Sequence, residues 1–159
     1  MSATGTLGTR LYVATTPLAN IYAAADNITD FQALTIDQEV LPLENIGSFS
    51  RDFTLVTFNA IGDGRTLKIK GPFNDGQLQL SAAFDLGVSG QQILFTACKT
   101  ANQDVYPFKM TFVGVDAYHS VCYFGALPMS YKIVAGAANT VLLAQITLEV
   151  DTEVFIGDV

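Results

Sequence analysis

The sequence predicts an all-β sandwich or barrel with one flanking α-helix. Apolar and polar residues alternate through most of the 159 residues, which is typical of strands with one buried face. Turn-forming residues such as Gly62-Asp63-Gly64 divide these segments at short intervals. Apolar residues recur with the spacing of an amphipathic helix in one long segment, residues 90–101. The length fits a single domain that spans residues 1–159.

The first half of the chain contains five segments with strand-like alternation, at residues 10–15, 35–41, 53–58, 65–70 and 77–84. Between the first two, residues 29–34 are expected to form a short helical turn, with Thr29 as N-cap and Gln32 at the capping-box position. Residues 42–52 have no clear period and are expected to be irregular. Asn74-Asp75-Gly76 is a strong signal for a β-hairpin turn.

The predicted helix covers residues 90–101 and follows a polar start signal. Ser89 is a good N-cap, and Gln92 stands three residues later at the capping-box position. The apolar stripe of this helix, which needs a sheet to cover, consists of Ile93, Leu94, Ala97, Cys98 and Ala101. Asn102 can adopt a left-handed conformation and so end the helix.

Strand patterns resume after the helix, at residues 106–115, 121–129, 129–134 and 141–155. The last segment has the most regular alternation in the chain. Its apolar face consists of Ile146, Leu148, Val150 and Val154. Its polar face carries an acidic row of Glu149, Asp151 and Glu153, spaced roughly 6 to 7 Å apart along a strand. Because like charges at this spacing repel, the acidic row faces either solvent or an anionic surface that it must not bind.

Low charge and high hydrophobicity distinguish the composition. Only 14% of residues are charged, against about 25% in ordinary soluble domains, and 50% are apolar. A lone molecule of this kind would expose broad apolar patches, so we expect other copies or a partner to cover part of its surface. The alternative is a neutral surface rich in Thr, Ser, Gln and Asn. The formal net charge of −7 argues against general nucleic-acid binding, which needs clustered Lys and Arg.

The titratable residues do not form a recognisable catalytic or metal-binding motif. His119 is the single histidine, and a solvated turn is favoured over a hydrolase triad with Ser120 and Asp116. Cys98 and Cys122 lack the spacing of a disulfide framework or a zinc site, and are expected to be reduced core residues. We therefore expect no enzymatic activity, no cofactor and no metal.

Neither a secretory signal nor a membrane span is expected. Residues 1–10 lack the apolar core of a signal peptide. The apolar segment 133–144 is too short and too interrupted to cross a bilayer. The sequence therefore predicts a soluble protein that is synthesised in the cytoplasm.

Ordered motifs along the chain carry a resemblance to a known family. They are Leu11-Tyr12-Val13 and residues 30–35 (DFQALT), 44–49 (ENIGSF), 56–65 (VTFNAIGDGR), 68–71 (KIKG), 74–78 (NDGQL) and 90–92 (GQQ). In this order and spacing, the chain resembles the major tail tube proteins of long-tailed bacteriophages and of phage-like particles such as gene transfer agents. One turn departs from the family pattern, because Phe73-Asn74-Asp75-Gly76 stands where Asp-Ala-Gly is expected.

The resemblance implies a structural protein of a particle tail that is assembled in the cytoplasm of a bacterial host. In that family, a sandwich with a side helix forms hexameric rings that stack into a tube, and the inner sheets join into one barrel around the lumen. The implied partners are further copies of the chain, a tape-measure protein, tail terminator and baseplate proteins, and double-stranded DNA that passes transiently and without sequence specificity. No membrane is involved. The alternative functions are a tube protein of a contractile tail or type VI secretion-like system, and a small β-sandwich binding or capsid-decoration module.

The resemblance also gives expected roles to three regions. Residues 42–65 are the expected ring-stacking loop or hairpin, for which the alternative is a plain surface loop. The charged residues available there for pairs across rings are Glu44, Arg51, Asp52, Asp63 and Arg65. The acidic row of Glu149, Asp151 and Glu153 is expected to line the lumen, where it would repel phosphates and let DNA slide. Residues 1–9 are expected to form a flexible N-terminal arm that orders on assembly.

Overall fold

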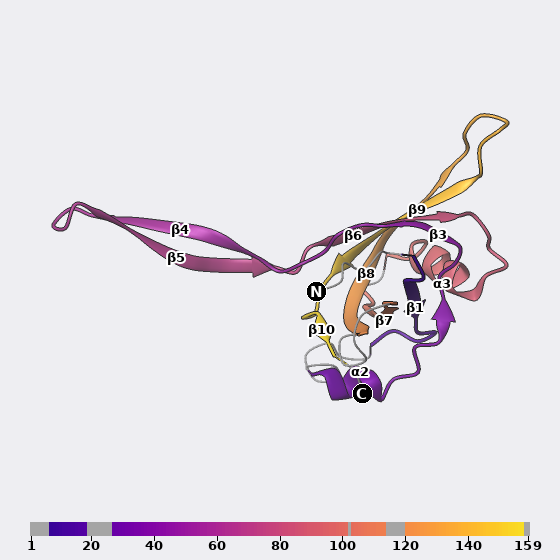
Figure 1. The fold of residues 1–159 in the computed structure, drawn as a ribbon, viewed down its shortest axis with the longest axis horizontal. Helices are drawn as coiled ribbons and strands as arrows, with labels where there is room; N and C mark the ends of the chain where they lie inside the picture. Colours follow the sequence, from indigo (N-terminus) through magenta and orange to yellow (C-terminus); the bar gives the residue numbers. More distant parts are fainter. Residues whose placement is uncertain (1–6, 19–26, 102, 114–119, 158–159) are drawn as a thin grey trace.

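The computed structural model describes residues 7–18, 27–101, 103–113 and 120–157, in which β-strands dominate (Figure 1). Eight strands form one antiparallel sheet: β1 (Arg10–Val13), β2 (Gln38–Glu39), β3 (Leu43–Ile46), β6 (Gln77–Ala83), β7 (Tyr106–Thr111), β8 (Val121–Val134), β9 (Leu143–Val150) and β10 (Phe155–Ile156). The order across this sheet is β2-β1-β7-β8-β9-β6-β3, and β10 lies beside β8. A separate two-stranded ribbon consists of β4 (Asp52–Ala60) and β5 (Arg65–Asn74). The described helices are α2 (Ile28–Gln32) and α3 (Ser89–Ala97).

The long strand β8 joins the two halves of the sheet. Its first half pairs with β7, and its second half, from Ala126 to Val134, pairs with β9. The register with β9 shifts between Pro128 and Ser130, and such a bulge bends its strand. The two halves thereby bury one shared core, which includes Leu11, Val13, Phe108 and Met110 from one half and Leu78, Leu80, Ile146 and Leu148 from the other. The predicted sandwich with a flanking helix is confirmed.

Helix α3 covers the core but is shorter than predicted. Leu94 is fully buried in the core, and the helix contacts β1, β2 and β8. The helix starts at Ser89 itself, and Val88 is its N-cap without a side-chain cap bond, so the predicted capping role of Ser89 is wrong. It ends at Ala97, whose carbonyl accepts a hydrogen bond from the Thr100 hydroxyl at 3.2 Å. Asn102, the predicted stop, lies outside the described residues.

Helix α2 begins two residues earlier than the predicted cap allows. The side chain of Asn27 accepts a hydrogen bond from the backbone N–H of Asp30 at 3.1 Å, so Asn27 rather than Thr29 is the N-cap. Phe31 of this helix is fully buried and its ring lies 6.2 Å from that of Tyr123 in β8. The helix therefore closes a second, smaller apolar cluster beside the β1–β7–β8 half of the sheet.

Two local predictions fail around residues 42–76. The segment expected to be irregular contains β3, which pairs with β6. Asn74-Asp75-Gly76 forms a tight turn, in which Gly76 has φ 90° and its N–H donates to Asn74 Oδ1 at 2.9 Å. This turn does not close a hairpin, because β5 pairs with β4 whereas β6 pairs with β3 and β9. The turn instead connects the ribbon to the sheet.

The last long strand also ends earlier than predicted. The faces of β9 are as expected, with Ile146, Leu148 and Val150 buried. After Val150, however, the N–H groups of residues 151 and 152 both bond to the carbonyl of Gly125, which breaks the ladder. The hydroxyl of buried Thr152 then accepts a hydrogen bond from Gly125 N at 2.7 Å. The chain re-enters the sheet only at β10, beside the first half of β8.

The segments 121–129 and 129–134, predicted as separate strands, form the single strand β8. In the described part of the chain, no helix is long and apolar enough to pass through a membrane. Most of the expected N-terminal arm, residues 1–6, lies outside the described residues.

Candidate assembly surface

The ribbon of β4 and β5 projects away from the sheet and helices, which we call the body (Figure 1). At its outer turn, Gly64 has φ 58°, a left-handed conformation that glycine permits at low cost, and its N–H donates to the Ala60 carbonyl at 3.2 Å. Among the described residues, neither strand of the ribbon pairs with a third strand. Because a two-stranded hairpin is at best marginally stable in water, the ribbon is the part of this fold that most needs a partner.

One face of the ribbon is apolar. Val56 pairs directly with Ile69, and Phe58 pairs with Leu67, so these four side chains share a face. Their exposed fractions are 44%, 55%, 59% and 45%, respectively. Fully burying one such side chain is worth about 1.5–3 kcal/mol, so covering this apolar face would stabilise an assembly substantially.

The opposite face of the ribbon is polar towards its outer end, although Leu55, paired with Lys70 nearer the root, is 61% exposed on this face. Thr57 pairs with Lys68, and Asn59 pairs with Thr66. The Thr66 hydroxyl donates a hydrogen bond to Asn59 Oδ1 at 2.8 Å, so polar groups on this face satisfy one another in the free molecule. The two faces of the ribbon therefore differ. Burying the apolar face against an apolar partner costs little desolvation free energy, whereas burying the polar groups of the opposite face would cost more.

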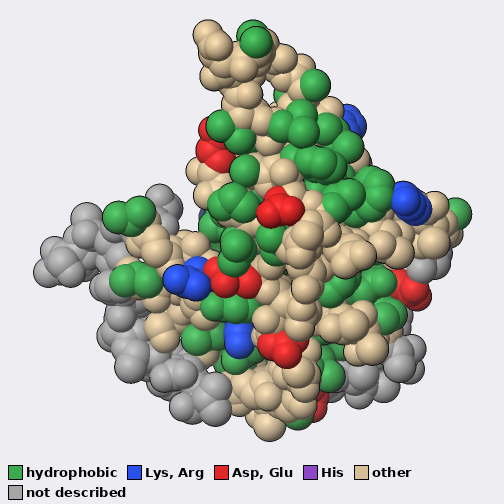
Figure 2. Space-filling view, turned by 90° about the vertical axis from the view of Figure 1, so that its right-hand side faces the viewer, with side chains coloured by type: hydrophobic (Ala, Val, Ile, Leu, Met, Phe, Trp, Pro, Cys, Tyr) green, Lys and Arg blue, Asp and Glu red, His purple; other side chains and the backbone are tan. Residues whose placement is uncertain are grey.

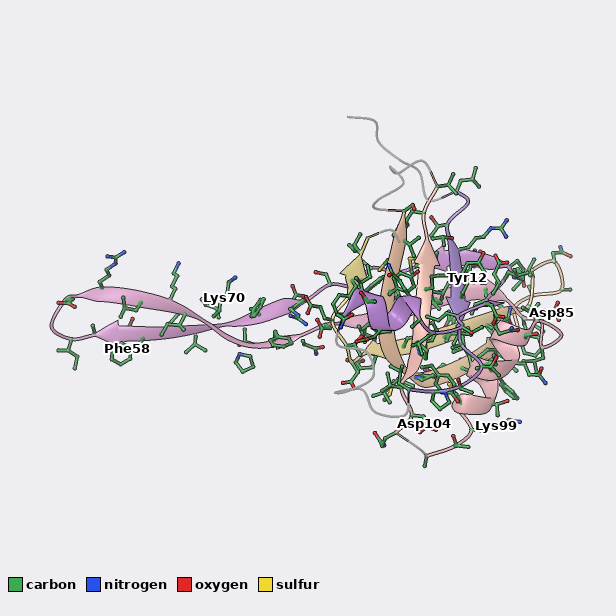
Figure 3. All side chains as sticks on the ribbon, turned by 90° about the horizontal axis from the view of Figure 1, so that it is seen from below. Tyr12, Phe58, Lys70, Asp85, Lys99 and Asp104 are labelled. Atoms are coloured by element: carbon green, nitrogen blue, oxygen red, sulfur yellow. The ribbon has the colours of Figure 1, made fainter. Side chains whose placement is uncertain are left out.

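The ribbon is also the basic element of an acidic protein. Figure 3 shows Lys70 and Phe58 pointing to opposite sides of it. Residues 52–74 carry three cations (Arg65, Lys68 and Lys70) and two carboxylates, whereas the rest of the chain carries five cations and thirteen carboxylates. A second copy of this chain would thus present a body of opposite charge to the ribbon.

The root of the ribbon is held by an ion pair and aromatic contacts. Arg51 donates from Nε and Nη2 to the two carboxylate oxygens of Asp75 at 2.7 and 3.3 Å. The hydrogen bond to Asp75 raises the pKa of Arg51, and burial opposes this rise more weakly. The Arg51 guanidinium also lies 4.1 Å from the centre of the Phe73 ring, which is 5.6 Å from the Phe53 ring. These contacts fix where the ribbon leaves the body.

The structure divides the predicted stacking residues into three places. Asp63 and Arg65 lie together at the outer turn, and Arg51 and Asp52 lie at the root. Glu44 lies apart from them on β3, where it accepts a hydrogen bond from Ser81 of β6 at 2.9 Å. The predicted segment 42–65 includes β4 but omits most of β5, which carries half of the apolar face. Sequence reasoning missed this face because alternation in residues 53–58 and 65–70 was expected to mark strands with one buried side.

The acidic row does not form one continuous strand face. Glu149 lies on β9, where it is partly buried and accepts a hydrogen bond from Gln77 Nε2 at 3.2 Å. Asp151 and Glu153 are exposed but follow the end of the strand. Glu153 lines a depression of about 240 Å³ at the ribbon root together with Arg51 and Asp75. The carboxylates therefore extend from the sheet towards the root of the ribbon.

The outer face of the sheet is polar and slightly hollow. A shallow depression of about 300 Å³ crosses β3, β6, β9 and β8, and its polar lining residues are Asn45, Gln79, Ser81, Lys132, Gln145 and Thr147. Lys132 is the only charged residue that lines it. This face is suited to contact with water or a polar surface rather than to binding a small apolar ligand.

The described residues do not bring together a catalytic or metal-binding group. Within the described ranges, no three His, Cys, Asp or Glu side chains converge as a metal site would require. His119 and Asp116 lie outside the described residues, so the disfavoured triad is not tested. Cys98 and Cys122 are both free thiols, and burial raises the pKa of Cys122 to about 12.

Solved structures of injection-system particles contain chains with this fold. A chain in the cryo-EM structure of an extracellular contractile injection system, PVC sheath/tube terminator in extended state, superposes with a TM-score of 0.67 at 13% identity and covers 98% of this chain and 96% of that chain. A chain of the anti-feeding prophage cap (AFP tube terminating cap) gives 0.67 at 15% identity, with coverage of 98% and 93%. A chain of the PVC sheath-tube complex in extended state gives 0.65 at 12% identity, with coverage of 99% and 93%.

These similarities extend over nearly the full length of both chains, the ribbon and helices included. At such low identity they show a shared tail-tube-like fold. No protein-family model and no curated protein sequence matches this chain.

Proposed function

We propose that this protein is a structural, non-enzymatic subunit of a phage-tail-like tube, which self-associates through its projecting ribbon. The observation that carries the proposal is the ribbon itself, a two-stranded element whose apolar face is about half exposed in the single chain. Such an element is at best marginally stable until something covers it. Low overall charge and an uncovered apolar surface both favour further copies of the chain as that cover.

Contractile injection systems are the favoured machine for this tube. Four structural neighbours are chains from an extracellular contractile injection system or the anti-feeding prophage, in structures of the sheath and tube, the tube terminator, the cap and the baseplate. The second candidate is a tail tube of a long-tailed phage or of a gene transfer agent. In either machine the subunit resides in the particle tail and contacts terminator and baseplate proteins at the ends of the tube.

The finer proposal is a stack of hexameric rings around a lumen. The polar outer face of β3, β6, β9 and β8 is the surface that we assign to the lumen, because neighbouring sheets joined edge to edge would close a barrel without free edges. Glu149 lies on this face, and Asp151 and Glu153 follow it. In a phage the cargo of this lumen is a tape-measure protein and then double-stranded DNA, which carboxylates would not retain.

The assembly state of the purified protein tests the proposal. Light scattering and negative-stain imaging over a wide concentration range should show rings or tubes whose mass is a multiple of the 17.0 kDa chain. A protein that stays a monodisperse monomer at the highest concentrations would contradict self-assembly. Rings with a symmetry other than six would contradict the hexamer while leaving the tube proposal intact.

A further inference from the structure

A second uncovered apolar surface lies on the body, beside α3. By strand alternation, Phe84, Ile133 and Leu142 share the sheet face of buried Ala82, Ala144 and Ile146. Ile133 is 51% exposed and Leu142 is 39% exposed. We call the surface formed by Phe84, Phe95, Tyr131, Ile133 and Leu142 the helix-side patch. Figure 2 shows apolar side chains gathered on this side of the molecule, next to its protruding tip.

The helix-side patch has a fixed aromatic floor. The Tyr131 ring lies 5.3 Å from the Phe95 ring and 6.4 Å from the Phe84 ring, centre to centre. The Tyr131 hydroxyl donates to Gln91 Oε1 at 2.8 Å, so its polar end is already bonded within the chain. Asp85 lies at the edge of the patch and Lys99 lies over the Phe95 ring at 4.2 Å. The patch therefore offers an apolar surface with one carboxylate, Asp85, beside Tyr131 and one cation, Lys99, over Phe95.

The ribbon and the helix-side patch lie on opposite sides of the molecule. In Figure 1 the ribbon extends to the left of the body, whereas α3 and the far ends of β8 and β9 lie to the right. One molecule therefore cannot place its own ribbon on its own patch. A contact between the ribbon of one copy and the patch of another leaves each pair with a free ribbon and a free patch, so it can propagate or close a ring.

We propose that the apolar face of the ribbon, formed by Val56, Phe58, Leu67 and Ile69, packs on the helix-side patch of a neighbouring copy. This inference rests on the proposed function and names the surface that the ribbon covers. The four ribbon residues are exposed in the single chain, and on the patch Ile133 and Leu142 are exposed whereas Phe84, Phe95 and Tyr131 are partly buried beneath them. Arg65 pairs with Ala60 at the outer end of the apolar face, and Asp85 borders the patch, so their charges complement each other.

Photo-crosslinking tests the location of the contact. Phe58 is replaced by photoreactive p-benzoylphenylalanine, and the protein is assembled as a mixture of ¹⁵N-labelled and unlabelled copies. After irradiation, mass spectrometry should find adducts between copies on peptides that contain residues 84–95 or 129–142. The matched control carries the same photoreactive residue at Thr57, on the opposite face of the ribbon, and should yield few adducts on these peptides.

A second pair of variants tests the patch from its own side. Ile133→Glu places a charge on the patch, whereas Val134→Glu places the same charge on the opposite face of β8. We expect Ile133→Glu to raise the concentration needed for assembly at least tenfold and Val134→Glu to change it much less. Equal effects of the two substitutions would overturn the inference.

The possible failures are distinguishable. Adducts from position 58 on another part of a neighbouring copy, or within the same chain, would overturn this contact and leave self-assembly standing. A wild-type protein that forms no assembly would instead contradict the proposed function.

Discussion

The carboxylate of Asp75 receives two hydrogen bonds from the guanidinium of Arg51, at 2.7 and 3.3 Å. Arg51 directly precedes β4 and Asp75 directly follows β5, so this pair ties together the two points at which the chain enters and leaves the ribbon. Asp75 is only 7% exposed and is the one buried charged side chain among the described residues. Bidentate pairs of this kind add geometric specificity as well as energy.

Replacing Asp75 with Asn should loosen the root of the ribbon. The amide cannot accept both Arg51 bonds and carries no charge, so the two strand ends separate more readily. Trypsin, which cleaves after the ribbon residues Arg65, Lys68 and Lys70, should then cut the unassembled protein faster than wild type. Asp63→Asn, at the outer turn, is the control and should leave the cleavage rate unchanged. An unchanged rate in the Asp75 variant would show that the aromatic contacts alone hold the root.

Phe58→Asp should abolish or strongly weaken assembly without unfolding the body. The Phe58 side chain is exposed on the ribbon and does not belong to either buried cluster, so thermal unfolding of the monomer should change little. The charge, however, would have to be desolvated in any contact that covers the apolar face. Thr57→Asp adds the same charge on the polar face and should assemble almost normally. Sedimentation velocity measures both, and equal loss of assembly would contradict a two-faced ribbon.

Gln91→Leu should destabilise the body. Gln91 is fully buried, and its amide is bonded to four groups: the Leu41 and Ala83 carbonyls, the Asp85 N–H and the Tyr131 hydroxyl. Leaving a buried polar group without a partner costs about 1–3 kcal/mol, so we expect a loss of at least about 3 kcal/mol in the free energy of unfolding. Urea titration measures it. Gln92→Leu, on the exposed side of the same helix, should stay within about 0.5 kcal/mol of wild type.

The Cys122 thiol should be inert until the protein unfolds. Burial raises its pKa from 9.0 to about 12, so almost none is thiolate at pH 8 and alkylation by iodoacetamide should be far slower than in urea. Because the pKa is higher in the folded state, the stabilising contribution of the neutral thiol is complete below pH 9. It is lost as the pH rises from 9 towards 12. Rapid alkylation of Cys122 in a Cys98→Ala background at pH 8 would contradict this environment.

Replacing Glu149, Asp151 and Glu153 together with Lys tests their proposed place in the lumen. We expect tubes still to form, because none of the three lies in a buried cluster. The new cations would bind phosphates, so variant tubes should retain short double-stranded DNA that wild-type tubes release. Co-sedimentation with labelled DNA measures retention, which should fall steeply as salt increases. Variant tubes that retain no more DNA than wild type would remove these residues from the lumen wall.

The sequence predicted which faces are buried wherever a strand lies over the core. Leu78, Leu80 and Ala82 of β6 are buried as expected, because alternation directly records a face that loses contact with water. The turn-forming residues predicted where the chain turns, but not which strands pair on either side of the turn. Asn74-Asp75-Gly76 adopts a tight turn, but a turn signal fixes only the local backbone and not the strand that the chain pairs with next. The end of α3 was missed because the apolar stripe continues to Ala101 although the helix does not.

The resemblance predicted a stacking loop or hairpin over residues 42–65, but strand alternation alone could not show that the ribbon has an exposed apolar face. Period-two alternation in residues 56–58 and 67–69 is the same whether the apolar side meets the core of its own chain or another molecule. The three-dimensional structure separates these cases, since Phe58 is 59% exposed whereas Leu80, with a similar pattern, is 2% exposed. The ion pair between Arg51 and Asp75 likewise could not be predicted from the sequence, because strand pairing brings the two residues together across 23 intervening positions.

The pairing of β3 with β6 makes the ribbon an insertion between two neighbouring strands of the sheet. A copy from which residues 52–74 have been removed would keep every strand of the body and its helix-side patch. Such a copy could receive a ribbon from the last subunit of a growing tube but would have none to offer in return. Added in small amounts, it would act as a chain stopper, and the mean tube length would then report the ratio of trimmed to intact subunits.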